Sequence, residues 1–167
     1  MSAPSTGMTT GNAARSRRSA GILLFRRNGG ELQVFLVHPG GPLWARKDDG
    51  AWSIPKGEHG TEEDALLAAQ REFMEETGAP IDGAFLALPP IRQPGGKVVT
   101  AWAVEGEFDP EQLQSNAFEL EWPPKSGGRR SFPEIDRGAW FAIDEARRKL
   151  LGGQVPLLDA LLAIVSL

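Results

Sequence analysis

The chain has no cysteine, no tyrosine and only two histidines among its 167 residues. The absence of cysteine excludes disulfide scaffolds, thiolate metal sites and cysteine nucleophiles. With only His38 and His59, a three-histidine zinc site cannot form within one chain. No apolar run approaches the roughly 20 residues that cross a bilayer, and the N-terminus lacks the apolar stretch of a secretory signal. We therefore expect a cytoplasmic protein without a membrane partner.

The chain also lacks a large excess of charge of one sign. The net charge is −4, with 24% charged and 41% apolar residues, as in an ordinary soluble domain. This balance argues against a general nucleic-acid or membrane-surface binder. The length suits one domain with a real core. Residues 1–18 are mostly small, polar or basic and predict a disordered tail, which leaves residues 19–167 as a single domain.

Strand and helix patterns alternate along this domain. Two short apolar runs flank Asn28-Gly29-Gly30, which predicts a β-hairpin. Thr61 is a good N-cap for a helix that ends at Gly78. The other expected elements are strands at 52–54, 81–88, 97–104 and 138–143, a loop at 121–133, and helices from 143 and over 155–165. The mixture predicts an α/β or α+β sandwich.

The helix after Thr61 carries three glutamates on one side. At about 100° per residue, Glu72, Glu75 and Glu76 fall within an arc of roughly 100°, beside the apolar arc of Phe73. Like charges at this spacing cost roughly 0.2–0.5 kcal/mol per pair, and the C-terminal end of a helix disfavours anions. A bound cation would offset both costs, and oxygen ligands suit Mg²⁺ or Mn²⁺. The alternative is an ordinary solvated acidic face.

The residues around these glutamates favour a cation-binding site over a solvated acidic face. From Gly57 the sequence runs through five residues to Glu63, then seven more to Arg71-Glu72-Phe73-Met74-Glu75-Glu76-Thr77-Gly78. This pattern resembles the signature box of the Nudix hydrolases. Its chance probability in such a chain is on the order of 10⁻⁷–10⁻⁶. Ala79 departs from the bulky aliphatic residue that the family prefers after the last glycine.

The resemblance implies an α/β fold, an α/β/α sandwich around a mixed sheet, and Mg²⁺- or Mn²⁺-dependent cleavage of a nucleoside diphosphate linked to another group. It implies that Glu72, Glu75 and Glu76 are metal ligands, together with the carbonyl of Gly57 or Lys56. It also implies that Arg71 orients a box glutamate, Glu63. Many family members draw a base or an extra ligand from outside the box, and Glu134 is our candidate.

Several residues outside the box are candidates for substrate binding. Lys56 stands in Trp-Ser-Ile-Pro-Lys-Gly, which resembles the start of the box in dinucleoside polyphosphate and diphosphoinositol polyphosphate hydrolases. Trp44 and Trp52 present flat faces on which a base can stack, although tryptophan often packs in a core. The remaining candidates are cations suited to phosphate: Lys125, Arg129 and Arg130.

These features favour hydrolysis of a dinucleoside polyphosphate or a nucleoside triphosphate. The alternatives are a nucleotide-sugar (ADP-ribose-like) or diphosphoinositol polyphosphate pyrophosphatase, or a domain that senses a nucleotide without cleaving it. The expected partner is a small nucleotide or polyphosphate substrate. The apolar stripe of the last helix, from Leu157 to Val165, predicts core packing, with a homodimer surface as the alternative.

Overall fold

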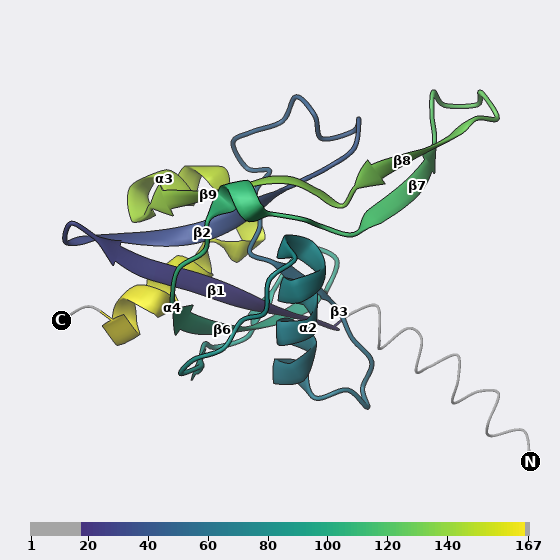
Figure 1. Cartoon of the computed structure of the whole chain (residues 1–167). Helices are drawn as coiled ribbons and strands as arrows, with labels where there is room; N and C mark the ends of the chain where they lie inside the picture. Colours follow the sequence, from purple (N-terminus) through teal and green to yellow (C-terminus); the bar gives the residue numbers. More distant parts are fainter. Residues whose placement is uncertain (1–17, 166–167) are drawn as a thin grey trace, which may run out of the picture.

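The computed structural model describes residues 18–165 (Figure 1). Most of the predicted tail, residues 1–17, lies outside the described residues. Arg18, which the sequence placed in the tail, instead begins the first strand, β1, and its carbonyl accepts a hydrogen bond from the His59 amide at 3.1 Å. Strand β1 therefore includes the last residue of the predicted tail.

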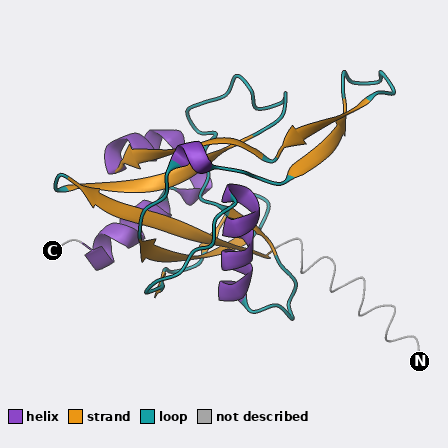
Figure 2. Cartoon of the chain, in the orientation of Figure 1, coloured by secondary structure: helices purple, strands orange, loops and turns teal. Residues whose placement is uncertain are grey.

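Within residues 18–165 the main sheet has seven strands in the order β4-β6-β1-β2-β9, with β3 paired to β1 and β5 to β6. Figure 2 shows the strands in orange and the helices in purple. The strands are β1 (Arg18–Asn28), β2 (Glu31–Pro39), β3 (Lys56–Glu58), β4 (Leu86–Ala87), β5 (Ile91–Arg92), β6 (Val98–Glu105) and β9 (Ile135–Ala142). β1 and β6 run parallel, whereas β2 is antiparallel to both β1 and β9. The mixed sheet is confirmed.

Helices cover both faces of this sheet. Alternate side chains of a strand point to opposite faces, so Ile22 and Leu24 pack against α2 (Ala65–Thr77). Leu23 and Phe25 point the other way, into the layer of α3 (Ile143–Lys149) and α4 (Pro156–Val165). The buried side chains of α4 include Leu157, Leu158 and Leu161, which confirms that its apolar stripe belongs to the core. The α/β/α sandwich follows.

The predicted hairpin joins β1 to β2 through Gly29 and Gly30, whose positive φ angles of 63° and 87° suit glycine. The two strands pair only near this turn, from Phe25↔Val34 to Asn28↔Glu31, and then diverge. Residues 52–58 fill the gap: the Ser53 carbonyl accepts from the Val37 amide, and β3 pairs with the start of β1. This divergence brings β3 to the C-terminal half of α2.

Four predicted elements need correction. Helix α2 begins at Ala65 rather than at Thr61, because the Asp64 side chain caps it by accepting from the Leu67 amide at 3.1 Å. Residues 52–54 make only isolated bridges, and the strand expected over 81–88 shortens to β4. The predicted loop 121–133 contains β8 (Arg129–Pro133), which forms a hairpin with β7 (Ala117–Glu121).

The β7–β8 hairpin projects from the body of the molecule in Figure 1. Phe118 pairs with Phe132 and Leu120 with Arg130, so these four side chains share one face of the hairpin. Its prolines and glycines, which suggested a loop, lie between the two strands or at their ends. Short 3₁₀ turns, η1 (Pro110–Gln112) and η2 (Gly152–Gln154), complete the described elements. Within residues 18–165, no helix combines the length and apolar character that a membrane span requires.

Candidate active site

The C-terminal half of α2 is locked in place by its own buried face. Ala69 and Phe73 are buried beneath it, and the Thr77 hydroxyl donates to the Phe73 carbonyl at 2.7 Å. Gly78 ends the helix in the left-handed conformation, with φ of 82°. With this face fixed against the sheet, Glu72 and Glu76 lie at its edge, where β3 passes.

β3 touches both carboxylates. The Lys56 amide donates to Glu76 Oε1 at 3.3 Å. A Cβ atom added at Gly57 would lie 2.0 Å from the carboxylate carbon of Glu72, so only glycine leaves room for that group. The strand backbone and the acidic edge of the helix therefore form one continuous cradle.

Arg71 organises the other acids. It donates from Nε and Nη2 to the two oxygens of Glu63, at 2.9 and 3.0 Å. Its Nη1 donates to Glu72 Oε2 at 2.8 Å and to Glu75 Oε2 at 3.2 Å. The expected Arg71–Glu63 ion pair is present, and the Glu63 hydrogen bonds raise the pKa of Arg71. The same bonds lower the pKa of Glu63.

Burial makes ionisation of the acidic edge costly. It raises the pKa of Glu76 to about 8, and the neighbouring charge of Glu72 adds to the shift. Burial also raises the pKa of Glu72, against the opposing hydrogen bond from Arg71. Burial and the charge of Lys97 lower the pKa of Lys56. Perturbed titrating groups of opposite charge that lie close together are typical of functional sites.

The raised pKa of Glu76 predicts a pH-dependent stability. Unfolding returns the pKa of Glu76 from about 8 toward its ordinary value of 4.5. Between pH 4.5 and pH 8 the folded chain therefore binds more protons than the unfolded chain, and the folded state loses stability as the pH rises. In a chelator we expect the melting temperature to fall between pH 5.5 and 8, by about 3 °C or more. Glu76→Gln removes the titrating group and should flatten this fall. Equal slopes for the two proteins would contradict the buried carboxylate.

A cavity of about 220 Å³ opens at this edge. It brings together Lys56, Glu76 and Glu134, with Trp44 on its wall. Glu134 precedes β9, and its backbone is held at both ends: its amide donates to the Asn116 carbonyl at 2.7 Å and its carbonyl accepts from the Gly40 amide at 2.8 Å. Residues distant in sequence thus meet over the acidic edge.

The other substrate candidates are not brought together. Trp52 is buried, packs edge-on against Phe141 and donates from its indole to Asp48 at 2.8 Å, so its ring serves the core rather than a substrate. Lys125 lies in the turn between β7 and β8, with φ of 62°. Arg129 is engaged by Glu119 at 3.1 Å. Arg130 shares the hairpin face of Leu120.

A buried histidine, His38, holds the loop that carries Trp44, and the sequence did not predict this role. His38 is fully buried, and its ring nitrogens lie 3.0 Å from Asp136 Oδ1 and 2.6 Å from the Lys47 carbonyl oxygen. His38 therefore ties the loop to β9 and does not face a substrate. The apolar pair Phe118 and Leu120 was also missed, although its alternation with Glu119 is a strand signal.

The acidic edge fits a divalent cation by its chemistry, since carboxylates and a backbone carbonyl are hard oxygen donors. Gly57 keeps room beside Glu72 that a Cβ would fill. Among residues 18–165, no three carboxylate or histidine side chains converge on one point, and Arg71 Nη1 bonds both Glu72 and Glu75. The donor set is present, and Arg71 sets its arrangement.

Comparison with solved structures finds the same fold in other proteins. The fold is similar to that of a Caenorhabditis elegans Ap4A hydrolase binary complex, at 19% identity over 89% of this chain and 98% of the other, with a TM-score of 0.63. It is also similar to a mutT/nudix family protein from Listeria innocua, at 19% identity over 89% and 93% of the two chains, with a TM-score of 0.58.

A third similar structure is the NUDIX domain of Shewanella oneidensis NrtR in complex with ADP ribose. The identity is 16% over 86% of this chain and 84% of the other, and the TM-score is 0.56. At such identities these structures show a shared fold. A model of the NUDIX domain matches residues 15–161, which span nearly the whole chain. The chain belongs to the NUDIX domain family.

Proposed function

We propose that this Nudix pyrophosphohydrolase cleaves a nucleoside diphosphate linked to another group, most simply a dinucleoside polyphosphate or a nucleoside triphosphate. The observation that carries the proposal is the junction of β3 and α2, where Glu72 and Glu76 meet the backbone of Lys56 and Gly57. This acidic edge borders a cavity that also holds a lysine and a further glutamate, Glu134. Cations and carboxylates side by side suit a polyphosphate and the water that attacks it.

Nudix hydrolases generally use divalent metals, and in this chain Mg²⁺ or Mn²⁺ would be held by Glu72, Glu75 and Glu76. The carbonyl of Gly57 or Lys56 would add a further oxygen. When bound, such an ion neutralises phosphate oxygens and lowers the pKa of water. Arg71 donates two hydrogen bonds to Glu63, and these bonds are independent of its bonds to Glu72 and Glu75. It can thus orient the helix while Glu72 and Glu75 take a cation.

The remaining chemistry belongs to side chains around the cavity. Lys56 faces the same space as Glu76 and would contact a phosphate oxygen. Glu134 enters from the opposite segment and is exposed, which suits a group that accepts a proton from water. Glu72 is the second candidate base, since it lies at the same edge of α2. Its side chain is only 13% exposed, and we therefore rank it after Glu134.

Replacing Glu134 by glutamine tests this assignment. The change keeps the side-chain size and removes the basic oxygen, so we expect kcat to fall at least tenfold with KM nearly unchanged. Glu62→Gln, at an exposed position outside the cavity, is the matched control and should behave as the wild type. Wild-type turnover by Glu134→Gln would transfer the role of the base to Glu72.

The substrate class is tested with a panel of nucleoside triphosphates, dinucleoside polyphosphates, nucleotide sugars and diphosphoinositol polyphosphates, with the products identified by mass. We expect the fastest turnover for one of the first two groups, with cleavage between phosphates. Preferred cleavage of ADP-ribose or of a diphosphoinositol would reassign the substrate. Tight binding of nucleotides without any product would indicate a sensing domain instead.

A further inference from the structure

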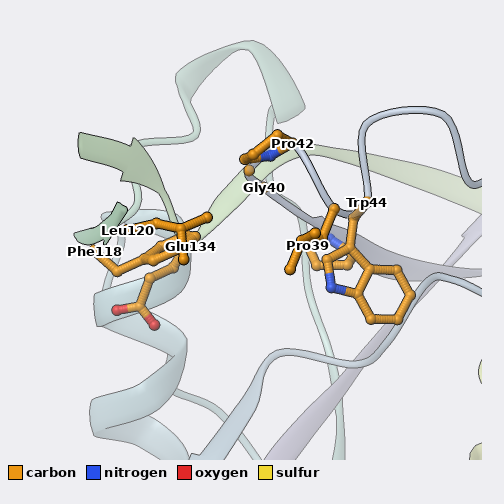
Figure 3. A pocket seen from close by; sticks show the side chains of 9 residues that line it. Pro39, Gly40, Pro42, Trp44, Phe118, Leu120 and Glu134 are labelled. Carbon is orange, nitrogen blue, oxygen red and sulfur yellow. The ribbon is translucent and has the colours of Figure 1, made fainter. Parts of the chain in front are cut away.

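A second cavity, of about 280 Å³, adjoins the acidic one (Figure 3). Pro39, Trp44 and Glu134 line both cavities, so the two cavities are neighbours; we call them the acidic half and the apolar half of the cleft. Both halves have many apolar lining residues; the charged side chains of Lys56 and Glu76 line the acidic half alone, and Glu134 lines both. The lining of the second half is Pro39, Gly40, Gly41, Pro42, Leu43, Trp44, Phe118, Leu120 and Glu134.

The second half is built by close approach of two segments. Gly40 comes so near to the end of β8 that a Cβ there would lie 2.1 Å from the Pro133 carbonyl oxygen. Gly41 has φ of +93°, and a Cβ there would lie 2.9 Å from the Phe118 ring. These two glycines let residues 39–44 pack on the base of the β7–β8 hairpin, which closes one end of the cavity.

The walls of the apolar half face each other in Figure 3. Trp44 and Pro39 stand on one side, and Phe118 and Leu120 stand on the other. The Glu134 carboxylate points away from these apolar side chains, and Glu134 also lines the acidic cavity with Glu76. A molecule whose phosphates lie in the acidic half would therefore extend its attached group between Trp44 and the hairpin.

We propose that the apolar half is the subsite for the nucleobase of the substrate, and that it selects a flat aromatic group by stacking and shape. This inference rests on the proposed function, because it places the phosphates in the acidic half. The cavity is slightly below the ~300–1,000 Å³ of typical ligand pockets, which suits one nucleoside. Stacking on an aromatic ring tolerates every base, because each has a π-face.

The lining predicts weak discrimination among bases. Apart from backbone groups, its polar side-chain atoms are the Trp44 indole N–H and the Glu134 carboxylate, and the latter points away. Strong rejection of a wrong base requires buried polar groups that are left unpaired. With few such groups, we expect methylene-bridged analogues of ATP, GTP, CTP and UTP to bind within about tenfold of one another.

Calorimetric titration with these analogues, in Mg²⁺, tests the subsite. Trp44→Ala should weaken all four by about tenfold or more, since stacking on one ring is worth about 5–150-fold. Trp44→Phe should recover most of this loss, and inorganic triphosphate, which has no base, should bind every variant as it binds the wild type. An equal loss for inorganic triphosphate would overturn the proposal. A preference of more than a hundredfold for one base would also overturn it.

A second variant avoids reliance on Trp44, which packs partly against the core. Leu120→Asp places a charge on the hairpin wall and should weaken the analogues to a similar extent. Leu67→Asp is the matched control, because Leu67 is 62% exposed on α2 and lines neither cavity. Equal binding by Leu120→Asp and Leu67→Asp would refute the subsite. Analogue binding that depends on Trp44, without hydrolysis of the parent nucleotides, would support the subsite and contradict only the proposed function.

Discussion

Glu76→Gln is expected to lower kcat by about 10²-fold or more while the chain stays folded. The variant keeps the shape of the side chain, and its amide can still accept a hydrogen bond from the Lys56 backbone. It loses the negative charge that the edge offers to a cation. The measurement is the steady-state rate on the best nucleotide substrate, with melting temperatures recorded in parallel.

Stability separates this loss from unfolding. Burial raises the pKa of Glu76 to about 8, so the glutamine variant should melt no lower than the wild type in a chelator at pH 8. Mn²⁺ should raise the melting temperature of the wild type by linkage and raise that of the variant less. A variant with normal turnover, or with the same gain from Mn²⁺, would remove Glu76 from the metal site.

Gly57→Ala is expected to have the second-largest effect. The added Cβ would lie 2.0 Å from the Glu72 carboxylate carbon, so that carboxylate must leave its position. We expect about 10²-fold lower kcat/KM at low Mg²⁺, partly recovered at high Mg²⁺, because the loss is one of metal affinity. The measurement is the Mg²⁺ dependence of the rate.

A matched control exists for this change. A Cβ at Gly152 would meet nothing within 4 Å, so Gly152→Ala adds the same methyl group in open space. It should retain wild-type activity and Mg²⁺ dependence. If Gly57→Ala behaves like Gly152→Ala, the cradle between β3 and α2 is not needed for the reaction.

Local patterns were sufficient to predict the helix that carries the acids. Helical periodicity placed Glu72, Glu75 and Glu76 on one side, and the pattern from Gly57 to Gly78 that resembles the Nudix box identified the loop before them. The full set of hydrogen-bond partners of Arg71 could not be predicted from the sequence. Its bonds to Glu72 and Glu75, in addition to Glu63, depend on how the turn before α2 folds back, and periodicity within a helix does not describe that turn.

The β7–β8 hairpin shows where composition misleads. Pro123, Pro124 and the nearby glycines indicated a loop over 121–133, but they lie mainly in the turn between strands. The apolar residues that pair across the hairpin, Phe118 and Phe132, are fourteen positions apart in the sequence. Single-segment patterns do not show such pairing, and so the wall of the apolar cavity was missed.

Trp44 and Trp52 illustrate the same limit for single residues. Both tryptophans were candidates for stacking on a base. The divergence of β1 from β2 draws residues 52–58 into the sheet and buries Trp52, whereas Trp44 stays on the loop at the cleft. Strand pairing between distant segments decides which of the two rings borders the cleft, and this information is absent from the residues on either side of each tryptophan.

The most direct test of metal-dependent phosphoanhydride cleavage at the β3–α2 junction is product release by the wild type with and without the ion. Phosphate or pyrophosphate release from a nucleotide panel is measured in millimolar Mg²⁺ or Mn²⁺ and in excess chelator. We expect turnover with either ion and at least a 10²-fold loss in the chelator, restored when the ion is added back. Undiminished turnover in excess chelator would contradict a metal role for Glu72, Glu75 and Glu76.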